Sequence, residues 1–307
     1  MTAPSPDAPG SRNWFLITVL GVIWGSAFMA TTVALEGFGS LQVAAGRVLV
    51  AAIILSCLRP ILRSQNGRIE GARAWAFALI IGTVSTALPF LLLSVGLQYV
   101  PSAFAGIAMG AVPLLVLPLA ALFLPDENIG PRRIAGLSMG FVGLVFLMSP
   151  SLTSGGSETE LIGQLACIGA AFCYATGSIV TRRAPKMPPF AFASTTLWTA
   201  SVVLVPAALV IEGLPATWDM RAGLALIYVA ALPTAAAAVI RILVITTAGS
   251  LFMSLTSYMV PVWAVIFGVA LLGEQITLNV LVALAVILGG IALAQWSAGV
   301  QRRRSKG

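Results

Sequence analysis

The second half of this 307-residue chain repeats the first half at an offset of 148 residues, without a gap. The segment Val112–Asp126 corresponds to Val260–Glu274, and each segment begins with Val-Pro and ends on an acidic residue two positions after a leucine. At the same offset Ser102 corresponds to Ser250. Internal repetition constrains the fold to two copies of one structural unit.

The composition indicates that these units lie in a membrane. Hydrophobic residues make up 59% of the chain and charged residues 9%, with a mean hydropathy of +1.00. A soluble domain carries about 25% charged residues, and a membrane-spanning helix needs about 20 mainly apolar residues. We therefore predict an all-α, polytopic membrane protein with ten transmembrane helices. The predicted spans are residues 14–34, 41–58, 74–97, 102–124, 132–149, 161–181, 190–211, 222–246, 250–272 and 277–297.

The ten spans divide equally between the two copies. The predicted units are a first five-helix repeat at 14–149 and a second five-helix repeat at 150–297, with tails at 1–13 and 298–307. Because five is odd, the two repeats must cross the membrane in opposite directions, which is the build of many transporters around a central cavity.

The basic residues predict the orientation. If the amino terminus is cytoplasmic, 14 of the 17 Lys and Arg residues lie in cytoplasmic segments, and only Arg221 lies in an outer loop. Retention of positive charge on the cytoplasmic side is the strongest orientation rule. We expect a multi-pass membrane protein with both termini cytoplasmic.

The chain lacks the residues that most chemistry needs. It has no histidine, no paired carboxylates near a span centre and no phosphate-cradling loop. Cys57, Cys167 and Cys173 lie in apolar runs without metal-ligand spacing. The basic residues are spread over several short loops and the carboxyl-terminal tail, and do not gather on one surface that could bind nucleic acid. We therefore predict no enzyme activity, no metal or cofactor, and no nucleic-acid partner.

Arg47 and Arg241 are the two charges predicted inside spans. A charge in hydrocarbon is costly and is a functional hypothesis by default. The structural alternative is that each side chain reaches an interface or pairs with a loop carboxylate such as Glu36. Arg241 is the better candidate, because a cation in span eight could attract a substrate carboxylate.

Prolines and glycines interrupt several spans. Pro113 and Pro261 correspond in spans four and nine, and Pro89 and Pro233 lie in the middle of spans three and eight. Interrupted spans at corresponding places mark the binding region of transporters, so these four prolines are predicted hinges, with a plain structural kink as the alternative. Gly136, Gly140, Gly143 and Gly289-Gly290 have the spacing that lets helices approach closely.

Aromatic and hydroxyl side chains near the span centres complete the predicted substrate site. The set consists of Trp24, Tyr174, Tyr258, Trp263, Ser26, Ser85, Ser178 and Thr234, together with Arg241. For each hydroxyl the alternative is a hydrogen bond within its own helix or to a neighbour. Together they describe a cavity with aromatic walls, suited to a small amphipathic solute.

The chain resembles the drug/metabolite transporter superfamily, in its ten-span branch of two EamA-type repeats. The resemblance is carried by Trp24-Gly25-Ser26, Gly46-Arg47, and the segments Val260–Glu274 and Leu284–Gly290. It implies that spans one, three and four pack with six, eight and nine around a central cavity, that both termini are cytoplasmic, and that Arg47 is structural. The sequence departs from the family pattern where Leu124-Pro125-Asp126-Glu127 replaces the usual Leu-Gly-Glu.

The expected function is secondary transport by alternating access. Similarity within the superfamily implies a bacterial exporter of small amphipathic metabolites, chiefly amino acids including aromatic ones. An exchanger of phosphorylated metabolites or nucleotide sugars is one alternative, and a non-transporting membrane scaffold is another. The expected partners are the lipid bilayer and a small solute, with the chain a monomer or a weak homodimer.

Overall fold

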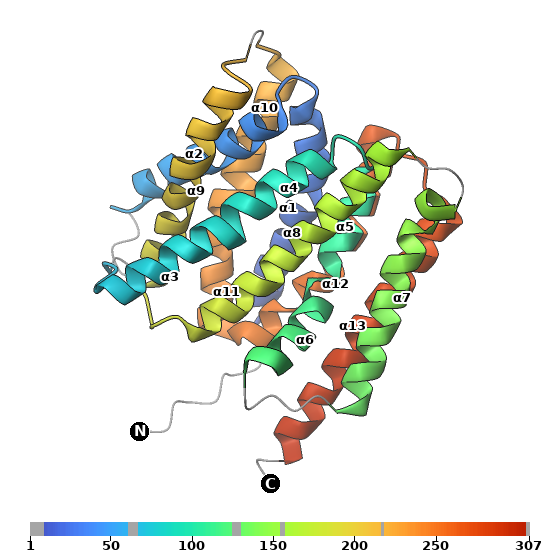
Figure 1. The fold of residues 1–307 in the computed structure, drawn as a ribbon. Helices are drawn as coiled ribbons and strands as arrows, with labels where there is room; N and C mark the ends of the chain where they lie inside the picture. The colour runs from blue at the N-terminus through green and yellow to red at the C-terminus, as the bar shows by residue number, and fades with distance from the viewer. Residues whose placement is uncertain (1–8, 61–66, 125–129, 154–156, 216–217, 305–307) are drawn as a thin grey trace.

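The computed structural model describes residues 9–60, 67–124, 130–153, 157–215 and 218–304, and within these ranges the chain forms helices and no strand. Figure 1 shows the helices as one bundle. In chain order the elements are α1 (Ser11–Leu35), α2 (Ser40–Leu58), α3 (Ala72–Gly82), the π-helical segment η2 (Thr83–Ala87), α4 (Leu88–Gly96), α5 (Ser102–Gly110), α6 (Val112–Phe123), α7 (Pro131–Thr153), α8 (Glu158–Arg183), α9 (Pro189–Ile211), α10 (Met220–Val229), the π-helical segment η3 (Ala230–Ala236), α11 (Ala237–Met253), α12 (Thr256–Leu272) and α13 (Leu278–Arg304).

These elements form the ten predicted spans. In the described residues nine helical stretches are long and apolar enough to cross a membrane, and the tenth, α12, is shorter at 17 residues. Span three consists of α3, η2 and α4, span four of α5 and α6, and span eight of α10, η3 and α11. Helix α1 begins and α13 ends on the same face, called the terminal face below (Figure 1). Glu274, after α12, lies on the opposite face, called the Glu274 face.

Side-chain and glycine caps set several helix ends. The Ser157 hydroxyl accepts a hydrogen bond from the Glu160 amide at the start of α8, and Asp219 accepts one from the Ala222 amide at the start of α10. Such caps satisfy amides that have no partner inside the helix. Helix α12 ends at Gly273, whose φ of 69° is left-handed, a conformation that glycine adopts at little cost.

The two π-helical segments occupy equivalent places in the repeats. An offset of 148 residues moves Thr83–Ala87 onto residues 231–235, inside η3. In η3, Pro233 has no amide hydrogen for the carbonyl of Val229, so the regular hydrogen-bond pattern fails there. π-helical turns inside longer helices are frequent at functional sites.

Two helix pairs flank the centre of the bundle. Helices α7 and α13 pack together on one side, and α2 and α9 pack together on the other (Figure 1). A Cβ added at Gly136 would meet the Gly290 carbonyl oxygen at 2.6 Å, and one added at Gly143 would meet Ile287 at 2.7 Å. The predicted role of these glycines in close helix packing is thereby confirmed. The arrangement leaves α1, α4, α5, α8, α10, α11 and α12 in the middle.

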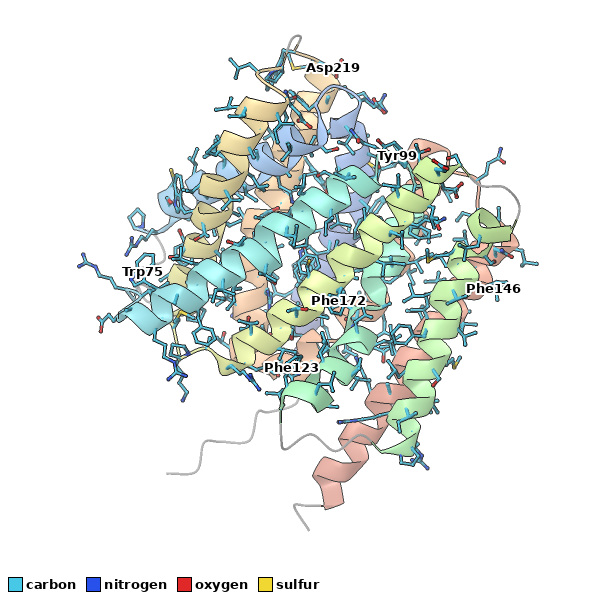
Figure 2. The ribbon with its side chains drawn as sticks, in the orientation of Figure 1. Trp75, Tyr99, Phe123, Phe146, Phe172 and Asp219 are labelled. Carbon is cyan, nitrogen blue, oxygen red and sulfur yellow. The ribbon has the colours of Figure 1, made fainter. Side chains whose placement is uncertain are left out.

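Large apolar side chains cover the outside of the bundle. Figure 2 shows Trp75, Phe146 and Phe172 projecting away from the helix axes, and all three are at least 36% exposed. Exposed apolar surface on this scale requires an apolar surrounding. The outer face is therefore the surface that contacts lipid.

The repeat is not exact at the junction of spans eight and nine. The helical run of α11 continues to Met253 through a break at Gly249 (φ 86°), so span nine consists of one short turn followed by α12. Span four instead breaks at Ala111, just before Pro113, which sits in the first turn of α6, where a missing amide hydrogen costs little. Pro261 lies inside the continuous helix α12. Of the corresponding prolines, only Pro113 coincides with a break.

Candidate functional site

Side chains of the first repeat bind the irregular centre of span eight. The Trp24 indole Nε1 on α1 donates a hydrogen bond to the Pro233 carbonyl oxygen at 3.1 Å. The Thr234 hydroxyl donates to the Val229 carbonyl oxygen at 2.9 Å, which is the acceptor that Pro233 leaves without its regular donor. The Val229 carbonyl at the end of α10 and the Pro233 carbonyl within η3 thus both accept side-chain hydrogen bonds.

Arg47 of α2 is held at this centre by η3 and α4. Its Nε donates to the Thr234 hydroxyl oxygen at 2.8 Å, and its guanidinium carbon lies 3.9 Å from the centroid of the Phe90 ring on α4. The residue is 7% exposed. A guanidinium over an aromatic face is attracted by the ring quadrupole. The predicted alternative of a pair with Glu36 is wrong, because Glu36 pairs with Arg221 at 3.2 Å.

Tyr174 on α8 lies across from Arg47. Its ring meets Phe90 edge-on, with the centroids 6.5 Å apart. Ser178 lies one turn further along the same face of α8 and is half-buried. The half-buried Ser85 of η2 contacts Gly177, where a Cβ would come within 2.3 Å of the serine side chain.

Arg241 lies on the core-facing side of α11. Ala237 and Val244, about one turn to either side on the same helix face, are buried. Arg241 itself is exposed. It lies seven residues, about two helical turns, after Thr234, which binds Arg47, in the same helical stretch.

Three further predicted residues are engaged elsewhere. The Ser26 hydroxyl donates to the Ile23 carbonyl and bonds the Tyr228 hydroxyl at 2.7 Å, so it links α1 to α10. The Tyr258 hydroxyl donates to Gln295 Oε1 on α13 at 3.1 Å. The ring of Trp263 stacks on that of Phe267, with centroids 5.6 Å apart, and stays half-buried.

On the Glu274 face the two repeats are joined by a carboxylate. The Glu274 side chain accepts hydrogen bonds from the amides of Ser102 at 2.6 Å and Ala103 at 3.1 Å, the first residues of α5. Glu212 does the same for α2, through the amides of Leu41 at 3.0 Å and Gln42 at 2.9 Å. A negative charge at a helix amino terminus is stabilised by the helix dipole.

Below Glu274, helix α5 lies against α12 with almost no space between them. A Cβ added at Gly106 would lie 2.1 Å from the Ala264 Cβ, and one added at Gly110 would lie 2.4 Å from the Pro261 Cγ. Helix α6, the other half of span four, packs instead on α8 and α7. We call the contact of Gly106 and Gly110 with α12, together with the Glu274 cap, the α5–α12 contact.

A recess of about 440 Å³ lies on the Glu274 face between the ends of α1 and α4. Thr32 and Leu35 of α1 line one side of the recess, and the consecutive residues Leu97, Gln98 and Tyr99 line the other. This recess is at the end of the spans, more than two helical turns from Trp24, and is distinct from the site at mid-depth.

Among the described residues no group of three or more His, Cys, Asp or Glu side chains could hold a metal.

Sequence reasoning does not identify Phe90, Tyr228 or the two carboxylate caps. Phe90 is one apolar residue in an apolar run, so nothing local distinguishes it. The two π-helical segments could have been suspected from the sequence. In each, hydroxyl residues interrupt an apolar run close to a proline: Ser85-Thr86 near Pro89, and Thr234 beside Pro233.

Comparison with known proteins gives one family and several relatives. The EamA-like transporter family matches at residues 13–149 and again at 161–296. The chain is 24% identical to a probable amino-acid metabolite efflux pump of Salmonella typhimurium, with 95% of this chain and 97% of that protein covered. It is 27% identical to the uncharacterized inner membrane transporter YedA of Escherichia coli, covering 89% and 87%. It is 25% identical to a probable terminal-alkyne amino-acid exporter of Streptantibioticus cattleyicolor, covering 91% and 92%.

A solved crystal structure shares the fold. It aligns with a TM-score of 0.66 at 22% sequence identity and covers 94% of this chain and 98% of its own.

Proposed function

The chain belongs to the EamA-like transporter family, and we propose that it exports small amphipathic metabolites, chiefly amino acids including aromatic ones, across a bacterial inner membrane. The names of two relatives, an amino-acid metabolite efflux pump and an amino-acid exporter, support this class of solute. The observation that carries the proposal is the set of partly exposed polar and aromatic side chains at mid-depth, where a packed scaffold would bury apolar ones.

The solute lies between the repeats, beside α1, α8 and span eight. Trp24, Tyr174 and Trp263 supply aromatic surface, Ser85 and Ser178 supply hydroxyls, and all five are half-buried. Arg241 presents a positive charge to the solute. Ser26, Thr234 and Tyr258 contribute as supports, through the hydrogen bonds that hold α1, α2 and α13 in place.

Transport follows alternating access. The α5–α12 contact closes the site on the Glu274 face, while α6 lies against α8 and away from the matching half of span nine. The concentration of basic residues on the terminal face supports a cytoplasmic placement of that face. The structure then corresponds to a state that loads solute from the cytoplasm, and bending at Ala111 and Pro113 opens the other side.

We expect no side-chain proton relay to couple this movement. The carboxylates of the described residues lie at helix ends, and the chain has no histidine. We expect facilitated movement down the solute gradient. Uphill transport into proteoliposomes driven by a proton gradient alone would contradict this expectation.

Counterflow in proteoliposomes tests the function. Labelled phenylalanine should exchange against unlabelled amino acids, and Tyr174→Ala should abolish the exchange. Phe172→Ala is the matched control, because Phe172 lies two residues away on the same helix, is 50% exposed and points outward (Figure 2). A flat response to every amino acid in the panel would remove the proposed class of solute.

A further inference from the structure

Two arginines at the centre of the bundle have no negative partner. In the described part of the chain, Arg47 makes a single hydrogen bond, through Nε to Thr234, and Arg241 makes no hydrogen bond or ion pair. Arg47 is 7% exposed, so the rest of its guanidinium is removed from bulk water. A buried charge without a counter-charge is strongly unfavourable unless something else supplies one.

Nearby protein groups do not supply that charge. Among the described residues each carboxylate lies within about one turn of a helix end, far from the middle of the spans. These carboxylates are Glu36, Glu70, Glu158, Glu160, Glu212, Asp219 and Glu274. Tyr174 packs edge-on against Phe90, the ring whose face Arg47 covers, and its hydroxyl can donate to an anion or accept from a guanidinium.

The strongest acceptors beside the arginines are already engaged. The Val229 carbonyl at the end of α10 and the Pro233 carbonyl of η3 accept hydrogen bonds from Thr234 and Trp24. The face of the Phe90 ring is covered by the Arg47 guanidinium at 3.9 Å. A solute with a free amino group would therefore place a third positive charge beside two others, with only neutral hydroxyls, those of Ser85, Ser178 and Tyr174, to receive it. In an interior of low dielectric this repulsion is large.

We propose that Arg47 and Arg241 flank a binding site for the carboxylate of the solute, and that the transported species is a monoanionic carboxylic acid with an apolar or aromatic tail in preference to a zwitterion. Amino-acid derivatives whose amino group is acylated or replaced by a hydroxyl meet this description. The planar guanidinium binds a carboxylate through two parallel hydrogen bonds, and Trp24 and Tyr174 contact the tail. This inference rests on the proposed transport function and narrows its substrate class.

The test uses three probes of the same size that differ in charge. L-phenylalanine is a zwitterion, 3-phenyllactate is an anion and 2-phenylethylamine is a cation. Each probe is measured as a competitor of labelled phenyllactate counterflow in proteoliposomes, and by its shift of thermal unfolding of the full chain in lipid nanodiscs. We expect phenyllactate to bind at least about tenfold more tightly than phenylalanine, with phenylethylamine weakest.

Variants assign the preference to the arginines. Arg241→Gln should reduce the advantage of phenyllactate over phenylalanine to about threefold or less, and Arg241→Lys should keep part of it, because the lysine retains the charge without the planar fork. Arg73→Gln is the control, since Arg73 is exposed at the start of α3. The nanodisc measurement on Arg241→Gln also reports whether the variant is folded.

The outcomes separate the inference from the function. Counterflow of phenylalanine equal to or faster than that of phenyllactate, unchanged in Arg241→Gln, would overturn the inference and leave amino-acid export standing. Absence of both flux and binding for all three probes would overturn the proposed function and the inference together. A tenfold preference for phenyllactate that survived in Arg241→Gln would show that the anion binds elsewhere.

Discussion

Replacement of Gly106 by alanine should open the Glu274 face. The new methyl carbon would lie 2.1 Å from the Ala264 Cβ and 3.4 Å from the Phe28 Cδ2. Two carbon atoms rest at about 3.5–4.0 Å, so α5 and α12 must separate by roughly 1.5 Å or more.

The size of the effect follows from the cost of that overlap. Overpacking by one methyl group costs about 1–3 kcal/mol. If opening relieves it, the ratio of closed to open molecules falls by about 5- to 150-fold. Helix propensity acts in the opposite direction, because alanine favours a helix over glycine by about 1 kcal/mol. A loss of closure therefore cannot come from a weakened α5.

Labelling of a cysteine within the contact measures closure. Ser102 is fully buried beside Glu274, so Ser102→Cys in a Cys57→Ser background should resist an impermeant maleimide in nanodiscs. Adding Gly106→Ala should make it reactive and reduce export. Cys167 and Cys173 are buried and serve as internal references for unfolding.

A swap of the methyl group provides the decisive control. Gly106→Ala combined with Ala264→Gly moves the methyl from α12 to α5 and should restore both protection and transport. Gly169→Ala should have no effect, because a Cβ there meets only Leu92 Cδ1, at 3.4 Å. Reactivity that is unchanged in Gly106→Ala, or that persists in the swap, would refute the assignment of this contact as the closure.

Three further tests address the supports of the site. Glu274→Gln weakens the cap on α5 by about 0.5–2 kcal/mol and should raise maleimide labelling within the α5–α12 contact. Glu212→Gln weakens the equivalent cap on α2, so it should lower stability without raising that labelling. Trp24→Phe keeps an aromatic ring but removes a hydrogen bond of 3.1 Å, so thermal unfolding in nanodiscs should report a loss of about 1 kcal/mol; an unchanged midpoint would mean that this bond does not hold α1. Thr234→Val leaves the buried Arg47 Nε without its acceptor and should cost about 1.5–3 kcal/mol, whereas Thr234→Ser should be tolerated; equal midpoints for the two variants would contradict the role given to the hydroxyl.

Most of the architecture could be predicted because it depends on local patterns. Runs of about 20 apolar residues give the spans, and the 148-residue offset gives the repeat. The junction at Gly249 could not be predicted, because the apolar run continues across it. The close contact of Gly136 with Gly290 was predictable from small residues at helical spacing. The contact of Gly106 with Ala264 could not be predicted, because the sequence does not show which helix packs against α5.

The site was predictable as a list of residues and not as an arrangement. Polar and aromatic side chains near the span centres are few in an apolar chain, so Trp24, Tyr174, Thr234 and Arg241 could be selected from the sequence. Nothing in the sequence distinguished Tyr174, which packs on Phe90 beside Arg47, from Tyr258, which bonds α13. Both are single tyrosines in apolar helices.

The sequence by itself determined the number of spans, the repeat and the absence of charge from the middle of the bundle except at Arg47 and Arg241. The tertiary structure decided which side chains meet, including the bond between Arg47 and Thr234, which are separated by 187 positions in the chain. The physical reason lies in the π-helical segments. Each residue of an α-helix turns the chain by about 100°, so a π-helical turn with its extra residue rotates every later side chain to another face. The direction of Arg241, beyond η3, therefore depends on a backbone irregularity that hydrophobic periodicity does not record.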